Sequence, residues 1–516
     1  MSNTSLLSKA SLDALLTTRR SDAVALAAPG RAPLSYADLG DLALSCRQSL
    51  AEVGLGRGDR VAIVLPNGPE MAAAFVAIAA TATTCPLNPA YRAEEFAFYL
   101  DDLGAKALVL AAGSDSPAAA VARERGIRIL ELSVPEGAPA GAFTLSSDGG
   151  AAAIAAAPAE PDDVALILHT SGTTSRPKIV PLSHSNVLAS AKHISASLDL
   201  GDGDCCLNVM PLFHIHGLIA AVLSSLYAGG SIFCTPGFNA LRFMGWLEDA
   251  KPSWYTAVPT MHQAILSRGQ RQAEAAKAAG LRFIRSSSAS LPPQIMGALE
   301  ELFDCPVIES YGMTEASHQM ASNELPPGQR KAGSVGRPAG PEVTLLLPDG
   351  ERSSAPGLVG EVIIRGPNVT LGYESNPKAN AEGFLQDEGG AWFRTGDQGT
   401  FDGDGFLTIT GRLKEIINRG GEKVSPREVD EILIDHPAVA QAVTFAMPHA
   451  KLGEEVAAAV VLEEGQSLDE RSLRDFAAKR LADFKVPRKV VFLEEIPKGA
   501  TGKLQRIGLA EKLGLG

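Results

Sequence analysis

Residues 164–178 read VALILHTSGTTSRPK, an apolar run followed at once by a stretch rich in hydroxyl side chains. The apolar part, 164–169, has the continuous aliphatic character of a strand in a buried parallel sheet. The part that follows, 170–178, offers backbone N–H groups, hydroxyls and one ammonium, which together suit phosphate oxygens. The spacing of a Walker A loop is absent, and by itself this stretch also fits an ordinary solvated turn.

Short apolar strands alternate with alanine-rich helical segments on both sides of this stretch. Strands are expected at 60–65, 107–111, 164–169, 231–234 and 282–285, and helices at 70–80 and 117–125. This alternation predicts an α/β fold in which mixed or parallel sheets are flanked by helices. Residues 138–162 are rich in Ala, Gly, Ser and Pro, and we expect a loop or linker there.

The last third of the chain changes character. Strands with turn signals between them are expected at 343–347, 360–365 and 406–410, which predicts a β-rich subdomain. A small α+β pattern follows, with helices at 426–435 and 468–480 and strands at 439–446, 455–462 and 489–492. Ser425 is the expected N-cap of the first of these helices, and Pro426 its first residue. We therefore predict a large N-terminal domain, 1–411, and a small C-terminal domain, 412–516.

Composition limits the classes of partner. The net charge of −13 disfavours a non-specific grip on nucleic acid or on an anionic membrane, because both need a basic surface. The six scattered cysteines predict reduced, buried thiols. Signal-peptide, bilayer-spanning and peroxisomal tripeptide patterns are all missing from the sequence, which predicts a cytoplasmic protein, monomeric or homodimeric.

Five more motifs follow the hydroxyl-rich stretch along the chain. They are PLFHIHG (211–217), ESYGMTE (309–315), RTGD (394–397), GRLKE (411–415) and PKGATGK (497–503). Each motif alone has an ordinary structural explanation, such as a turn or a core histidine. All six in this order resemble the adenylate-forming superfamily of acyl-CoA synthetases, peptide-synthetase adenylation domains and firefly-type luciferases, over nearly the whole chain.

The resemblance implies that the chain binds ATP, Mg²⁺, coenzyme A and a small carboxylic acid, with a mobile C-terminal domain. Tyr311 then stacks on adenine, Thr314 contacts the α-phosphate, and Glu315 with Thr173 holds Mg²⁺. The nucleotide-binding residues implied in this way are Thr170, Ser171, Gly172, Thr173, Thr174, Lys178, Ser288, Ala289, Glu309, Ser310, Tyr311, Gly312, Thr314, Asp397 and Arg412.

The same resemblance implies the catalytic residues. They are Lys503, His214, Thr314 and Glu315. Lys503 bridges the attacking carboxylate and the α-phosphate, and stabilises the charge that develops there. Lys414 is the implied hinge, and Gly420 and Gly421 line the channel for the thiol of coenzyme A.

The identity of the acid is indicated by polar segments. His214, Arg285, the serines of 286–290 and His318 suit a small acid with a second carboxylate better than a fatty chain. These segments also resemble those of oxalate–CoA ligases from plants and fungi, which implies oxalate held by His214, Ser290 and His318. Alternatives are malonate, a hydroxycinnamate or a medium-chain fatty acid as the acid, a carrier-protein thiol as the acceptor, or a non-catalytic nucleotide-binding scaffold.

Overall fold

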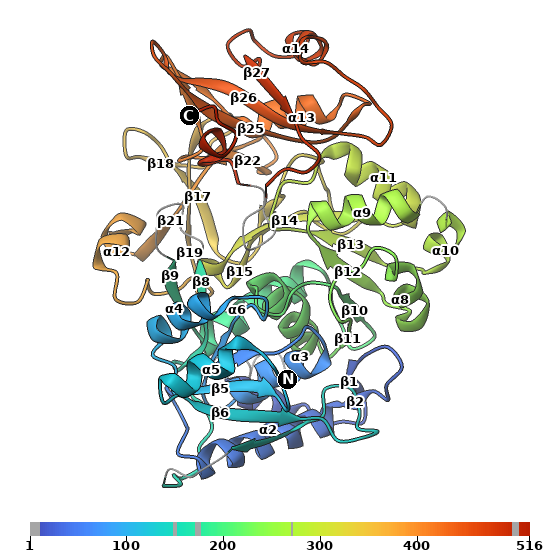
Figure 1. Cartoon of the computed structure of the whole chain (residues 1–516), viewed down its shortest axis with the longest axis vertical. Helices are drawn as coiled ribbons and strands as arrows, with labels where there is room; N and C mark the ends of the chain where they lie inside the picture. Colours follow the sequence, from blue (N-terminus) through green and yellow to red (C-terminus); the bar gives the residue numbers. More distant parts are fainter. Residues whose placement is uncertain (1–10, 148–151, 171–176, 270–271, 498–504) are drawn as a thin grey trace. The chain divides into compact units, whose positions relative to one another are not determined.

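The structure, a computed structural model, describes residues 11–147, 152–170, 177–269, 272–497 and 505–516 (Figure 1). These residues form two compact units. The first holds most of the chain up to 343 together with 364–393, and the second holds 344–363 and the residues from 394 onward. The domain boundary predicted at 411–412 stays a prediction.

A seven-stranded sheet in the first unit contains the apolar run 164–169. In spatial order its strands are β7 (Thr144–Ser147), β6 (Arg128–Ser133), β5 (Ala107–Ala111), β3 (Arg60–Val64), β4 (Thr83–Pro86), β8 (Val164–Thr170) and β9 (Lys178–Ser183). The five inner strands are parallel, and β7 and β9 are antiparallel edges. The parallel sheet predicted from the alternating pattern is confirmed.

A nine-stranded sheet forms the rest of the framework of the first unit. In spatial order its strands are β16 (Arg337–Pro338), β15 (His318–Ser322), β14 (Val307–Met313), β13 (Phe283–Ser286), β12 (Trp254–Ala257), β10 (Cys205–Asn208), β11 (Ser231–Cys234), β1 (Val24–Ala27) and β2 (Leu34–Ser35). The strands from β14 to β1 are parallel, so the carboxyl ends of β12, β13 and β14 share one edge. Ligands of α/β proteins bind at such edges.

Helices fill the space between these two sheets and cover their outer faces (Figure 1). Between them lie α3 (Pro69–Ala79), α6 (His184–Ser197) and a π-helix (His216–Leu223). The α3 helix is apolar all round, as its burial on every side requires. The outer helices are α4 (Ala93–Leu103) and α5 (Pro117–Glu124) on one sheet, and α8 (Phe243–Ala250), α9 (Pro259–Gly269), α10 (Ala273–Ala278) and α11 (Pro293–Phe303) on the other. The remaining helices of this unit are α1 (Leu12–Thr18), α2 (Tyr36–Glu52), α7 (Ser224–Ala228) and α12 (Pro377–Gly383).

Two further sheets complete the fold. A six-stranded sheet contains β18 (Arg352–Ser353), β17 (Glu342–Leu346), β19 (Val359–Arg365), β21 (Gly390–Phe401), β20 (Phe384–Asp387) and β22 (Leu407–Arg412). A five-stranded sheet contains β24 (Glu422–Val424), β23 (Ile417–Arg419), β26 (Gly453–Leu462), β25 (Val439–His449) and β27 (Lys489–Phe492). One face of the five-stranded sheet packs on α13 (Pro426–Ile434) and α14 (Glu470–Ala478), and the other on α15 (Leu509–Lys512).

Two local predictions have opposite outcomes. The N-cap of α13 is confirmed, because the Ser425 hydroxyl accepts a hydrogen bond from the backbone N–H of Glu428 and Pro426 opens the helix. The linker predicted over 138–162 is partly wrong, since it contains β7. Exposed and half-buried Thr and Ser residues make β7 look like a loop, but its backbone pairs with β6 along one edge.

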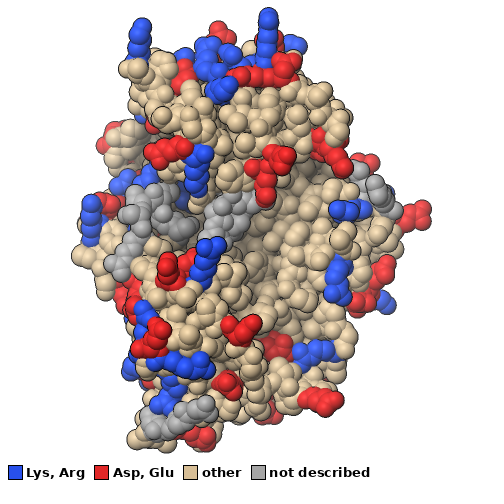
Figure 2. Space-filling view, viewed as in Figure 1, with Lys and Arg blue, Asp and Glu red and all other residues tan. Residues whose placement is uncertain are grey.

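The surface carries both signs of charge. On the face shown in Figure 2, lysine and arginine side chains are interspersed with aspartate and glutamate. Among the described residues, no helix combines the length and the apolar character needed to cross a bilayer. All six cysteines lie within the described ranges and are free thiols, five of them buried.

Arg506 ties the C-terminal tail to the body of the second unit. Its Nη2 lies 2.6 Å from Oδ2 of Asp430 on α13, and its Nη1 donates to the carbonyl oxygen of Thr444 over 2.9 Å. Its Nε lies 3.4 Å from a carboxylate oxygen of Glu415. The Arg506–Asp430 pair is largely buried, so each of its two charges depends on the other for compensation.

We expect Arg506→Met to lower the free energy of unfolding of the second unit by about 3 kcal/mol, because it leaves the Asp430 carboxylate buried without a cation. Urea denaturation of the full chain, followed by a probe in this unit, measures the change. The double variant Arg506→Met/Asp430→Leu should recover most of the loss. A single variant as stable as the parent would show that the pair contributes nothing.

Candidate active site

The hydroxyl-rich stretch 170–178 joins two antiparallel strands of the seven-stranded sheet. Thr170, at the end of β8, is in register with Lys178, at the start of β9. The sheet therefore holds both ends of this stretch, and the strand predicted at 164–169 is confirmed as β8. Four residues predicted to bind phosphate lie outside the described residues, namely Ser171, Gly172, Thr173 and Thr174.

Tyr373 connects this turn to Glu315. The Lys178 ammonium lies 4.2 Å from the centroid of the Tyr373 ring, and the Tyr373 hydroxyl donates to Oε1 of Glu315 over 2.8 Å. A cation over a ring face is attracted by the negative face of the π-system. A single tyrosine thus brings together residues from two motifs that lie more than a hundred positions apart in the sequence.

The segment that carries Tyr373 is fixed on both sides. The backbone N–H of Thr370 donates to the carbonyl oxygen of Glu315 over 2.8 Å. Arg60 Nη2 lies 2.7 Å from each carboxylate oxygen of Glu374. Tyr373 was not predicted as a site residue, because an aromatic residue in a polar turn is a common arrangement and the sequence has no other signal at this position.

A tight reversal after β14 carries the next group of predicted residues. Half-buried Tyr311 and Gly312 lie near the end of β14, which leads into the 3₁₀-helix Thr314–Ala316. Ser317 and His318 then reverse the chain with φ of 48° and 104°, values that residues other than glycine rarely adopt. A Cβ at Gly312 would collide with the carbonyl oxygen of His318, so glycine alone permits this approach.

Glu309 and Ser310 use polar groups to hold a neighbouring loop. Glu309 Oε1 accepts a hydrogen bond from the backbone N–H of Leu291 over 2.9 Å, and the Ser310 carbonyl accepts one from the Ser287 hydroxyl over 3.0 Å. Both bonds fix the loop that follows β13. That loop carries the predicted residues Ser288, Ala289 and Ser290.

His216 lies in a polar cluster at the carboxyl edge of the nine-stranded sheet. Its Nδ1 lies 3.0 Å from the Ser288 hydroxyl, and its Nε2 lies 2.6 Å from the Thr256 hydroxyl. Its ring centroid lies 5.1 Å from that of His318. His214 is the histidine of this motif predicted to contact the acid, and the structure adds His216. His216 is the first residue of a π-helix, an element frequent at functional sites.

Arg285 contributes a buried charge to this cluster. Its Nη2 donates to Oε1 of Gln319 over 3.2 Å and lies 3.5 Å from Nδ1 of His318. Burial lowers the pKa of Arg285 to about 9, so the guanidinium still carries its proton at neutral pH. The cluster is therefore cationic and rich in donors, which suits an anion; the roles of His214 and Ser290 stay predictions.

Asp397 and Arg412 lie side by side in the second unit. They are in register across β21 and β22, and Arg412 Nε lies 3.1 Å from Oδ1 of Asp397. The Asp397 side chain is 4% exposed while that of Arg412 is 41% exposed. A buried carboxylate with an accessible guanidinium can serve the two hydroxyls of a ribose, as the resemblance implied.

The other predicted residues of the second unit lie on its surface. Lys414 is exposed and lies two residues after the end of β22. Gly420 and Gly421 form the exposed turn between β23 and β24, with φ of 60° and 103°, a conformation that favours glycine. Lys503 lies outside the described residues.

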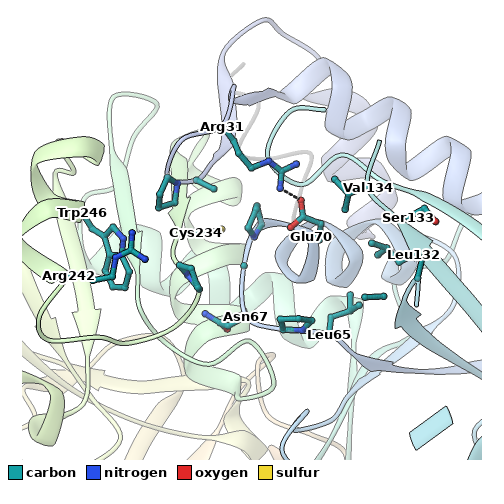
Figure 3. Close-up of a pocket in the computed structure, with 18 residues that line it drawn as sticks. Arg31, Leu65, Asn67, Glu70, Leu132, Ser133, Val134, Cys234, Arg242 and Trp246 are labelled. Atoms are coloured by element: carbon teal, nitrogen blue, oxygen red, sulfur yellow. Dashed lines mark hydrogen bonds and ion pairs between the residues drawn. The ribbon is translucent and has the colours of Figure 1, made fainter. Parts of the chain in front are cut away.

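A cavity of about 780 Å³ occupies a different part of the first unit, at the carboxyl ends of β3, β5, β6, β1 and β11 (Figure 3). An ion pair between Arg31 and Glu70 lies in its wall. None of the predicted site residues lines it. Asn67, also in the wall, accepts a hydrogen bond from the backbone N–H of Leu212 over 2.8 Å, which links the cavity to the motif 211–217.

Known proteins match the chain along nearly its whole length. The AMP-binding enzyme family matches residues 16–374, and the AMP-binding enzyme C-terminal domain matches residues 428–503. An oxalate–CoA ligase from Arabidopsis thaliana is 46% identical, over 94% of this chain and 94% of that protein. An oxalate–CoA ligase from Saccharomyces cerevisiae is 43% identical, over 88% and 87%.

A more distant relative and a solved structure extend this result. A sulfoacetate–CoA ligase from Cupriavidus necator is 35% identical, over 92% of each chain. The crystal structure of ATP-bound MatB from Rhodopseudomonas palustris is 29% identical, with a TM-score of 0.84, over 98% of this chain and 99% of that one. The fold and the family expected from the six motifs are thus confirmed, and the chain belongs to the AMP-binding enzyme family.

Proposed function

We propose that this chain is an AMP-forming acid–CoA ligase whose acid is oxalate. The observation that carries the proposal is the similarity, over most of both chains, to two relatives named oxalate–CoA ligase. The polar, cationic cluster around His216, Arg285 and His318 supports it, because a buried positive charge is a poor neighbour for a fatty chain and a good one for an anion.

The proposed reaction has two steps. One oxalate carboxylate attacks the α-phosphorus of ATP, which forms oxalyl-adenylate and releases pyrophosphate. The coenzyme A thiol then loses its proton and attacks the activated carbonyl carbon, which forms oxalyl-CoA and releases AMP. Both steps bring anionic or polar groups together, so the protein contributes chiefly by positioning and by neutralising charge.

Residues of the first unit have distinct roles in this proposal. Tyr311 stacks on adenine, Thr314 holds the α-phosphate, and Lys178 neutralises charge on the outer phosphates. Glu315 fits Mg²⁺, because this ion takes one or two carboxylates in addition to phosphate oxygens, and Tyr373 already orients the carboxylate. When bound there with Thr173, Mg²⁺ would neutralise phosphate charge.

Residues of the C-terminal part act in turn. Asp397 and Arg412 hold the ribose in the adenylation step, while Lys503 bridges the oxalate carboxylate and the α-phosphate. The C-terminal domain then rotates about Lys414 and presents the turn at Gly420 and Gly421 to the thiol. The cytoplasmic location and the oligomeric state stay predictions.

ATP–pyrophosphate exchange with a panel of acids tests the proposal. We expect oxalate to support exchange at a specificity constant at least about tenfold above those of malonate, a hydroxycinnamate and octanoate, because the cationic pocket favours a compact dianion. Adding coenzyme A should release AMP in amounts equal to the oxalyl-CoA formed. Strong exchange with octanoate and none with oxalate would exclude the proposed acid.

We expect Lys503→Ala to slow adenylation by about a hundredfold or more, since it removes the charge that is most needed as the two anions meet. Thioester formation from supplied oxalyl-adenylate should change little. The exposed Lys512, near the C-terminus, offers a matched control, and Lys512→Ala should leave both steps intact. Equal losses in both steps would contradict the proposed alternation.

We expect Tyr373→Phe to raise the Mg²⁺ concentration needed for half-maximal adenylation by about tenfold or more, because Glu315 loses the hydroxyl that orients it. Titration of Mg²⁺ in the exchange assay measures this shift. Tyr36→Phe is the matched control, because Tyr36 also has a buried, hydrogen-bonded hydroxyl, which donates to the carbonyl oxygen of Gly230 over 2.6 Å. An unchanged Mg²⁺ requirement in Tyr373→Phe would separate Glu315 from metal binding.

A further inference from the structure

Arg285 is a buried cation without an anionic partner in the part of the chain that the structure describes. Its side chain is 0% exposed. Its two hydrogen-bond acceptors, Gln319 Oε1 and His318 Nδ1, are not carboxylates. Its Nε and Nη1 have no hydrogen-bond partner at all among the described residues. The guanidinium therefore carries an uncompensated positive charge inside the protein.

Such a charge is costly to the folded state. A buried ion without a counter-ion loses its hydration and gains no compensating attraction. An apolar side chain of similar length, such as methionine, would fill the same space without this cost. The position of Arg285 in the cluster must therefore be explained by something other than stability.

The strand register places Arg285 beside the proposed acid site. Arg285 on β13 pairs with Thr256 on β12, and so both side chains lie on the same face of the sheet. Thr256 is bonded to His216, whose ring lies 5.1 Å from that of His318. This face of the sheet packs against the π-helix that begins at His216. The charge is thus directed at the histidine pair.

Arg285 also determines which nitrogen of His318 carries the proton. A guanidinium has only donors, so the contact of 3.5 Å to Nδ1 of His318 requires that nitrogen to accept. When the His318 ring is neutral, its proton is therefore on Nε2.

We propose that Arg285 is the residue that selects acids with a second anionic group: its uncompensated charge attracts that group, and it positions the His318 ring beside which the group binds. This inference rests on the proposed function, in that the acid must bind beside His318. Arg285 is sealed from solvent, so it acts through His318 and through its field, as a positioning residue. It therefore discriminates by the charge of the acid more than by its shape.

Oxamate provides the matched probe, because it has nearly the shape of oxalate but carries a neutral amide in place of the second carboxylate. In ATP–pyrophosphate exchange, we expect the parent protein to have a KM for oxalate at least about tenfold below that for oxamate. Arg285→Met should remove this preference by raising the KM for oxalate at least about tenfold more than the KM for oxamate. Arg285→Lys, which keeps the charge, should retain part of the preference.

Thermal unfolding provides a second measurement. Without acid, Arg285→Met should unfold at the same temperature as the parent or at a higher one, because the variant no longer buries an unpaired charge. Oxalate should raise the unfolding temperature of the parent and not that of the variant. A purely structural role for Arg285 predicts the reverse, namely a less stable variant that keeps its preference for oxalate.

Gln319 offers a test that leaves Arg285 in place. Gln319→Glu puts a carboxylate where the amide oxygen now accepts from Arg285 over 3.2 Å, and so supplies an internal counter-ion. The preference for oxalate over oxamate should then fall as in Arg285→Met. Gln319→Met is the control: it removes the same bonds to Ser197 and Ala339 without adding charge, and it should keep the preference.

The outcomes separate this inference from the proposed function. A preference for oxalate that survives in both Arg285→Met and Gln319→Glu overturns the role of Arg285. Absence of exchange with oxalate overturns the proposed acid, and malonate and succinate are then compared with their monoamides. If the parent prefers a diacid to its monoamide and Arg285→Met does not, selection by charge is upheld. If the parent binds a diacid and its monoamide equally well, selection by charge is overturned. If Arg285→Met does not fold, the comparison of Gln319→Glu with Gln319→Met decides.

Discussion

The close approach of the Gly312 backbone to the carbonyl oxygen of His318 is the constraint on which the site depends. Because no side chain separates β14 from β15 at this point, the chain reverses within a few residues. One arm of the reversal carries Tyr311 and leads to Glu315, and the other begins with His318. The proposed nucleotide residues Tyr311 and Glu315 and the proposed acid residue His318 are therefore held by one short piece of backbone.

Charged side chains are arranged differently on the two sides of the reversal between β14 and β15. On one side, Glu315 is held by the Tyr373 hydroxyl, and Lys178 lies over the same ring. On the other side, Arg285 lies among neutral acceptors. The first arrangement is compensated within the protein and suits a ligand that brings its own cation. The second is uncompensated and suits a ligand that brings an extra negative charge, at a cost in stability.

The second unit differs from the surroundings of Arg285, because two of its buried charges are paired with charges of the same unit. Arg506 meets Asp430, and Arg412 meets Asp397. The first pair anchors the C-terminal tail to α13, so that the chain following the last predicted motif has a fixed end. The second pair leaves its guanidinium accessible. A unit that must keep its own structure while it presents residues to a ligand gains from such internal compensation.

The sequence by itself determined the fold class, the family and the positions of those helices and strands that have a clear apolar or turn pattern, because hydrophobic periodicity and turn residues are local properties and the six motifs stand in a specific order. It misread 138–162, since an edge strand made of hydroxyl residues has the composition of a loop. Only the tertiary structure decided that His216 joins His318, that Tyr373 reaches Glu315, and that Arg285 has no anionic partner among the residues that the structure describes. Those three facts depend on which distant segments meet and on which polar groups remain unpaired after burial, and no local pattern of residues encodes either.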